Sequence, residues 1–301
     1  MLRALLLLIL SLFVASNVAA RVLVDQMGRS VDVVSPLTRV VALAPNLTEI
    51  SFEVGGGAAL VGVTRFATHP AAATELPRVG SYVALDLEKI VSLKPQLCLA
   101  IRDGNPKADI DRLESLGIPV YVFDPQSLEE ILDTVTRLGE IFGTQSRAQH
   151  LVAGYRARLE RVTRSAAEIP ERVRVFFQID ADPIISIGSN TFLHRLLTRA
   201  GGVNLAADRV GYPRYTWEEL LMLQPEVVFI TSMGGGLSAA ELRRRWQAWP
   251  QIPAVRHDQL YVVDADLFDR PTPRLIDGLE TLVSLLQQAN TAWPSVSGTD
   301  R

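Results

Sequence analysis

The chain has 301 residues, 48% of them hydrophobic and 21% charged, which is enough for about two domains of ordinary size. Its formal net charge of −3 argues against a nucleic-acid partner, because proteins that bind nucleic acids present basic surfaces. The single cysteine, Cys98, excludes an internal disulfide and a thiolate metal cluster. Since it lies inside an apolar run, we predict a buried structural thiol.

Residues 1–20 have the composition of a cleavable secretory signal. A lone Arg3 precedes an apolar run at 4–15, and Val18 and Ala20 complete a cleavage-type motif. The run is shorter than the roughly 18–20 residues that cross a bilayer, which favours a signal over a membrane anchor. No cysteine stands directly after the predicted cut, so we expect a periplasmic protein without a lipid anchor.

The next part of the chain alternates apolar runs with amphipathic stretches of helix length. Short buried strands separated by helices are typical of a parallel α/β sheet covered on both faces. We predict strands at 40–43, 60–63, 96–101 and 120–123, and helices at 45–54, 86–93, 107–116 and 127–142. These elements are predicted to form an N-terminal α/β lobe at residues 21–143.

One long helix is predicted at 144–169, ended by Pro170, because its apolar residues follow a 3.6-residue period. A second α/β series follows, with strands at 173–179, 227–231 and 260–263 and helices at 191–200, 216–223, 239–249 and 273–290. The fold class is therefore α/β. We predict two similar lobes with mainly parallel sheets, a backbone helix at 144–170, a C-terminal lobe at 171–290 and a frayed tail at 291–301.

The two series share a repeated segment. Residues 87–95 read LEKIVSLKP and residues 217–225 read WEELLMLQP, and a predicted strand follows each. In both, a glutamate precedes the proline by seven residues, at Glu88 and Glu218. The repeat falls at the equivalent place in each series, which favours two related lobes.

Several kinds of catalytic or metal site do not match the sequence. The glycines at 55–57 lack the GxGxxG spacing, and no GKS or GKT of a phosphate-binding loop is present. No GxSxG motif for a nucleophilic serine appears, and the four histidines are too scattered for a metal site. We therefore expect no metal site and no enzymatic activity, with a periplasmic hydrolase kept as a minor alternative.

Aromatic and polar residues gather in loops that follow the predicted strands. Ligands of open α/β sheets bind outside the carboxyl ends of the strands, so these loops are the expected site. They are residues 45–46, 65–66, 82 and 102–105 in the first lobe, and 182–184, 212, 233–236 and 266–270 in the second. Aromatic faces on opposing lobes suit a large, flat, partly apolar ligand.

Four segments carry a resemblance to a known family. They are VVALAPNLTE at 40–49, GVT at 62–64, LEKIVSLKP at 87–95 and FDRPTPR at 268–274. With them the chain resembles the periplasmic substrate-binding proteins of ABC importers, in the class III type whose lobes are joined by a helical backbone. The resemblance spans residues 38–290 and is particularly to members that bind vitamin B12 (cobalamin).

The resemblance implies that a corrinoid is captured between the lobes. Carried over position by position, it makes Phe66, Tyr82, Tyr212, Asp266 and Arg270 the expected ligand contacts. Tyr82 and Tyr212 stand where the vitamin B12 receptor has tryptophans. The bound corrinoid would be cargo, and the protein would need no cofactor of its own.

The resemblance leaves other ligands open, because relatives carry haem or ferric siderophores. Ile101 and Ile185 replace aromatic positions of the vitamin B12 receptor, so the pocket is less aromatic. Haem-binding relatives use a tyrosine in the loop that holds Tyr82, but one residue earlier. A carrier of haem or of a ferric siderophore is therefore the alternative function.

The same resemblance implies a protein partner, the permease dimer of an inner-membrane ABC importer. Glu88 and Glu218 would each meet an arginine of one permease subunit. Each glutamate lies in the first turn of its predicted helix, where the helix dipole by itself favours a negative charge. We expect the protein to act as a monomer.

Overall fold

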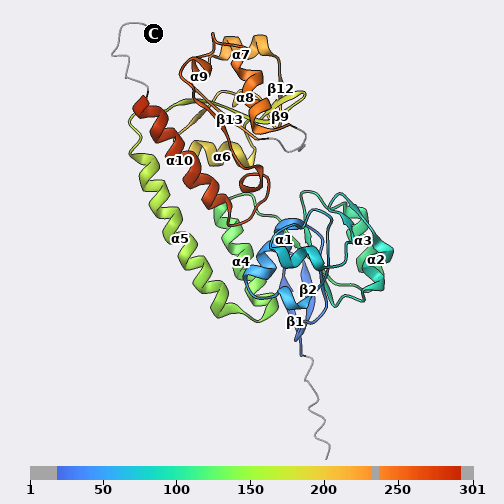
Figure 1. Ribbon diagram of the computed structural model, residues 1–301. Coiled ribbons are helices and arrows are strands. Elements are labelled where there is room, and N and C mark those ends of the chain that lie inside the picture. Colours follow the sequence, from blue (N-terminus) through green and yellow to red (C-terminus); the bar gives the residue numbers. More distant parts are fainter. Residues whose placement is uncertain (1–18, 232–236, 293–301) are drawn as a thin grey trace, which may run out of the picture.

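The computed structural model describes residues 19–231 and 237–292, which form two α/β halves beside a set of long helices (Figure 1). Residues 1–18 of the predicted signal, the predicted ligand loop at 233–236 and the tail from 293 lie outside the described residues. Within the described ranges, no helix is long and apolar enough to cross a membrane. We call residues 19–143 the N-terminal half and residues 171–292 the C-terminal half.

The N-terminal half is built on a four-stranded parallel sheet in the order β4-β3-β7-β8. Its strands are β3 (Val40–Ala42), β4 (Leu60–Val63), β7 (Leu97–Ile101) and β8 (Val120–Phe123). Two antiparallel hairpins lie beside it, β1 (Ala19–Val24) with β2 (Ser30–Ser35) and β5 (Gly80–Ser81) with β6 (Ala84–Leu85). Its helices are α1 (Pro45–Glu53), α2 (Leu87–Ser92), α3 (Lys107–Ser115) and α4 (Leu128–Phe142), with short 3-10 turns at Gly57–Ala59 and Ala71–Glu75.

The central sheet of this half is covered on both faces. Successive residues of one strand point to opposite sides, so Leu97 and Leu99 enter the core under α1 and α4. Cys98 and Ala100 enter the core under α2 and α3. Cys98 is fully buried, which confirms the predicted structural thiol, and burial raises the pKa of that thiol to about 12.

The C-terminal half has a six-stranded sheet in the order β12-β10-β9-β13-β14, with β11 also paired to β9. Its strands are β9 (Arg174–Ala181), β10 (Ile184–Ser186), β11 (Val203–Asn204), β12 (Arg214–Tyr215), β13 (Val227–Ile230) and β14 (Leu260–Val262). Strands β10 and β12 run antiparallel to their neighbours, and the other pairs are parallel. The helices are α6 (Phe192–Arg199), α7 (Trp217–Leu223), α8 (Ala239–Gln247), α9 (Pro253–Arg256) and α10 (Leu275–Ala292), with a 3-10 turn at Ala265–Leu267.

The predicted long helix is α5 (Gln145–Ala167), whose 23 residues extend for about 34 Å at 1.5 Å per residue. Val152 packs into the core of the N-terminal half, and Leu159 packs into that of the C-terminal half. Tyr155, between them, contacts both cores. Helix α10 lies alongside α5, where the Gln287 amide donates hydrogen bonds to Ser165 (Figure 1).

Helix α4 also contributes to both cores, which the sequence analysis did not anticipate. Its neighbours Ile131 and Leu132 enter the C-terminal and N-terminal cores respectively. Two helices therefore connect the halves through buried apolar contacts, where the sequence predicted one. The residue limits predicted for the lobes stay a prediction.

Most predicted elements are confirmed to within two residues, but small antiparallel pieces were missed. No strand was predicted at 22–36, whereas β1 and β2 form a hairpin that buries Val31 and Val33. Ile184 was assigned to a ligand loop. That assignment is wrong, because Ile184 is buried in β10 and pairs with Tyr215 of β12.

Candidate functional site

Tyr82 lies at the tip of the β5–β6 hairpin. The hairpin is attached to the end of β4, where the Arg65 amide donates to the Gly80 carbonyl over 2.8 Å. Gly80 has a φ of +91°, and a Cβ there would lie 2.5 Å from the Ala84 carbonyl oxygen, so a side chain is excluded. The Tyr82 side chain remains 37% exposed at the tip.

Phe66 follows β4 and forms an exposed aromatic pair with Tyr82. The two ring centroids are 6.2 Å apart, with the rings edge to face. The Arg65 guanidinium lies 4.9 Å from the centroid of Phe66, within the range of a cation–π contact. Phe66 is 43% exposed, so the pair offers aromatic surface that the fold leaves uncovered.

Asp266 and Arg270 form a second pair on the C-terminal half, after β14. Their charged groups approach to 3.4 Å. The Arg270 guanidinium also reaches the N-terminal half, where it donates to the Thr68 hydroxyl over 3.4 Å. Because Thr68 is two residues from Phe66, this contact brings the loops of the two pairs together.

Tyr212 lies in the loop between β11 and β12 and is 61% exposed. Partial desolvation raises the pKa of its hydroxyl, and the charges of Asp103 and Asp269 raise it further. Asp103 belongs to the N-terminal half and Asp269 to the C-terminal half. Within the described residues, no hydrogen bond, ion pair or ring contact joins Tyr212 to the other four predicted ligand residues.

Asp269 adds an unusual carboxyl next to Arg270. Burial and the neighbouring Asp266 raise the pKa of Asp269 to about 7, against the opposing effect of Arg270. Its Oδ1 atom is buried without a hydrogen-bond partner. Near neutral pH this carboxyl is therefore partly protonated, a feature that neither spacing nor composition could indicate.

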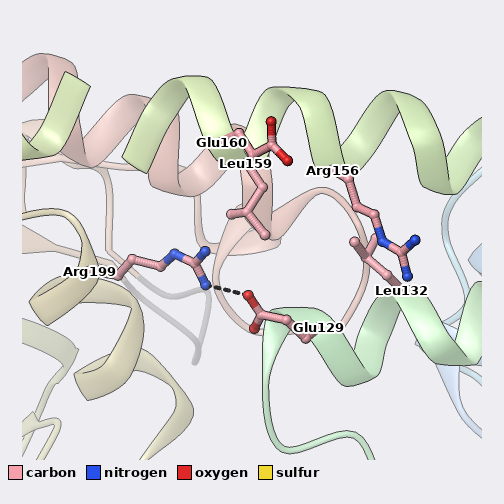
Figure 2. Close-up of a pocket in the computed structure, with 6 residues that line it drawn as sticks. All are labelled: Glu129, Leu132, Arg156, Leu159, Glu160 and Arg199. Carbon is pink, nitrogen blue, oxygen red and sulfur yellow. Dashed lines mark hydrogen bonds and ion pairs between the residues drawn. The ribbon is translucent and has the colours of Figure 1, made fainter. Parts of the chain in front are cut away.

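A hollow of about 200 Å³ lies elsewhere, between α4, α5 and α6 (Figure 2). Two arginines, two glutamates and two leucines line it, and Arg199 is already paired with Glu129 at 2.7 Å. None of the five predicted ligand residues belongs to its lining. In the parts of the chain that the structure describes, no group of three metal-ligating side chains is placed to hold a metal ion.

Glu88 and Glu218 are both exposed in the first turns of α2 and α7. In residues 19–231 and 237–292, neither carboxylate makes a hydrogen bond or ion pair. The adjacent Glu219 differs, because it closes a capping box with Thr216 and pairs with Arg209 at 2.5 Å. The fold thus uses Glu219 and leaves Glu218 available to a partner.

The structure repeats the same local geometry at the other end of both helices. Lys94 and Gln224, each just before a proline, have φ angles of +47° and +48°, which are uncommon for residues with side chains. The Arg39 side chain donates to the Leu93 carbonyl over 2.9 Å, and the Arg174 side chain donates to the Leu223 carbonyl over 2.7 Å. The repeat seen in the sequence is therefore also a repeat of backbone conformation and hydrogen bonding.

Charged groups between the halves lie around α1. Burial raises the pKa of Glu49, although Arg274 lies 3.8 Å from its carboxylate and opposes that shift. One turn later, the Tyr155 hydroxyl of α5 donates to the Glu53 carboxylate. Burial and the charge of Glu49 raise the pKa of Glu53 to about 7, with Arg147 opposing and Asp277 adding to the shift.

The chain is similar to known periplasmic binding proteins in both sequence and fold. The family model described as periplasmic binding protein matches residues 40–267. The vitamin B12-binding protein of Vibrio cholerae is 34% identical over 256 residues, which is 84% of this chain and 91% of that protein. The crystal structure of the periplasmic vitamin B12-binding protein of Vibrio cholerae matches with a TM-score of 0.76 and 33% identity, over 84% of this chain and 98% of that one.

A haem-binding protein has the same fold. The periplasmic haem-binding protein of Pseudomonas aeruginosa matches with a TM-score of 0.72 and 28% identity, over 83% of this chain and 93% of that chain. The predicted α/β fold and the resemblance to class III binding proteins are confirmed. The ligand is not fixed by these matches.

We predict that Glu53→Gln changes how stability depends on pH. A carboxyl with a pKa of about 7 in the folded chain and 4.5 when unfolded stabilises the fold fully below pH 4.5, and this contribution is lost as the pH rises to about 7. The amide stays neutral, so the variant should gain unfolding free energy relative to wild type between pH 4.5 and 7.5. Urea unfolding across this range measures the gain, and the exposed Glu168→Gln is the control. Parallel profiles for Glu53→Gln and wild type would contradict the assignment.

Proposed function

This chain belongs to the periplasmic binding protein family, and from that premise we propose that it captures a corrinoid of the cobalamin type and delivers it to an inner-membrane ABC importer. The observation that carries the proposal is the exposed Phe66–Tyr82 pair of one half, linked through Thr68 to Arg270 of the other. The identity with the vitamin B12-binding protein of Vibrio cholerae supports this ligand class.

The chemistry of these residues suits a large macrocycle edged with amides. The faces of Phe66, Tyr82 and Tyr212 would pack against its apolar surface, since aromatic rings contribute large contact areas. Asp266 would accept hydrogen bonds from amide N–H groups, and Arg270 would donate to amide carbonyls. The Arg270 guanidinium and the Asp266 carboxylate are 3.4 Å apart, and the Asp266 side chain is half exposed. Each group would therefore be able to exchange the other for a ligand group.

The second candidate is haem or a ferric siderophore, favoured by the fold shared with the Pseudomonas aeruginosa haem-binding protein. Haem carries two propionates. Asp266, and Asp269 in its ionised fraction, would oppose those charges, because like charges repel most strongly where water is partly excluded. The carboxylates therefore favour an amide-edged corrinoid over a dicarboxylate porphyrin.

We also propose that the protein works in the periplasm as a monomer and without catalytic activity. Its family consists of transport-binding proteins, which supports a carrier role. The predicted hydrolase alternative would need a nucleophile next to a base at the site, and the five predicted ligand residues supply no such pair.

Calorimetric titration of the purified protein against cyanocobalamin, cobinamide, haemin and a ferric siderophore tests the ligand class. We expect saturable binding to one or both corrinoids and weaker or no binding to haemin and the siderophore. Preferential binding of haemin would support the second candidate. Failure of all four to bind would contradict the carrier proposal.

The tyrosines provide a test of the site. Tyr82→Ala and Tyr212→Ala should each lower the free energy of corrinoid binding by roughly 1–3 kcal/mol, the range for losing a buried aromatic contact. Both side chains are more than a third exposed in the free protein, so its urea unfolding should change little. Tyr261→Phe, on β14 and not among the predicted ligand residues, serves as a control. Unchanged affinity in both alanine variants would rule out this site.

The importer would meet the free carboxylates of Glu88 and Glu218. Charge-assisted contacts with arginine are geometrically specific, and charges at the rim of an interface act mainly on association and orientation. Helices α2 and α7 hold these carboxylates at corresponding places of two related halves. Two such carboxylates suit a two-fold permease dimer.

We predict that Glu88→Arg combined with Glu218→Arg abolishes stimulation of the importer while corrinoid affinity in solution is retained. The measurements are uptake by reconstituted vesicles and calorimetric titration of the same variant. Glu160→Arg combined with Glu168→Arg makes the same change in net charge at exposed positions of α5 and of its C-terminal cap, and should leave uptake intact. Normal uptake by the first variant, or its loss of corrinoid binding, would refute the docking role.

A further inference from the structure

The loop between β7 and α3 contacts the tip of the Tyr82 hairpin. Within it, Asn105 is 7% exposed and its amide joins three segments. Its Nδ2 atom donates to the Leu43 carbonyl and to the Tyr82 carbonyl, each over 2.8 Å. Its Oδ1 atom accepts from the Ile101 amide over 2.7 Å. The tip of the hairpin is therefore tied to the carboxyl ends of β3 and β7.

Gly104 lies against the ring of the same tyrosine. Its φ is +133°, and a Cβ at this position would lie 2.8 Å from Cδ2 and 3.1 Å from Cε2 of Tyr82. Real Cβ atoms do not approach so closely, so the ring occupies its place because residue 104 has no side chain. The Tyr82 ring is therefore bounded by the Gly104 backbone and, at its edge, by Phe66.

Without these two contacts, the turn and the Tyr82 ring could adopt other positions. A two-residue turn projecting from β5 and β6 has little packing of its own. The hydrogen bond from the Asn105 side chain to the Tyr82 carbonyl fixes the backbone of the turn. The backbone of Gly104 limits how far the Tyr82 ring can move toward β7. Both residues lie in the loop that follows β7, so the position of the ring is set relative to the central sheet.

We propose that Gly104 and Asn105 are positioning residues that set the place of the Tyr82 ring and so the fit of the bound macrocycle. The inference rests on the proposed function, and it deepens the assignment of that site. Neither residue needs to touch the ligand. Each acts through Tyr82, which makes its effect on affinity depend on the presence of the tyrosine ring.

The experiment is a double-mutant cycle on cyanocobalamin affinity with Gly104→Ala and Tyr82→Ala. Gly104→Ala should weaken binding about tenfold, as expected when a methyl group displaces a packed ring. In the Tyr82→Ala background, the same substitution should produce no further loss. Gly117→Ala is the matched control, because Gly117 also has a positive φ of +77° but has no atom within 4 Å of an added Cβ.

A second readout does not depend on any ligand. In protein with isotope-labelled tyrosine, the Tyr82 ring resonance is identified by its absence from Tyr82→Ala. Gly104→Ala and Asn105→Asp should both shift it, whereas Gly117→Ala should not. Asn105→Asp keeps the acceptor for Ile101 and removes the two donors, so it also covers the case in which Gly104→Ala fails to fold.

The outcomes separate the two proposals. An unchanged Tyr82 resonance in folded Gly104→Ala and Asn105→Asp overturns the positioning role, whatever the ligand. Equal losses of affinity from Gly104→Ala with and without the Tyr82 ring overturn it as well. If Tyr82→Ala binds cyanocobalamin normally, this inference fails, and the proposed site fails with it if Tyr212→Ala also binds normally. If the resonance shifts but no corrinoid binds, only the proposed ligand is refuted.

Discussion

The structure depends on the burial of two neighbouring helices, α4 and α5, in the cores of both halves. Ile131 and Leu132 are adjacent on α4 and enter different cores, and Val152 and Leu159 divide α5 in the same way. A rotation of one half against the other would have to expose some of these apolar side chains, at about 25 cal/mol per Å². The packing therefore favours small relative movements of the halves, in contrast to a hinge made of extended strands.

Polar contacts also join the halves, and their energetic role differs. Arg270 reaches Thr68, Arg274 lies near the buried Glu49, and the Arg199 guanidinium of α6 binds Glu129 of α4. Desolvation offsets much of the attraction in partly buried ion pairs, so they contribute more to orientation than to stability. Apolar packing thus holds the halves together, while the polar contacts fix where the loops after the strands meet.

The sequence was sufficient to predict the parallel strands and most helices, because short apolar runs between amphipathic stretches are compatible with few folds other than a parallel α/β sheet. The runs at 60–63 and 120–123 have the observed limits of β4 and β8. Short antiparallel strands such as β10 and β12 could not be predicted, since three and two residues are too few for a periodic pattern. The burial of α4 in two different cores could not be predicted either, because a sequence pattern identifies apolar positions but not the core that each one enters.

For the candidate site, residue types could be predicted but their environment could not. Apart from the repeated segment, nothing in the sequence distinguished Glu218 from Glu219, which the capping box and Arg209 occupy. The repeat alone selected Glu218, and the structure supplies the reason, since Arg39 and Arg174 hold the ends of α2 and α7 in the same way. The carboxylates proposed for docking therefore sit on helices fixed to the sheets, whereas the ligand residues sit on loops. Such a division lets a carrier family change its ligand by altering loops while the geometry presented to its importer stays constant.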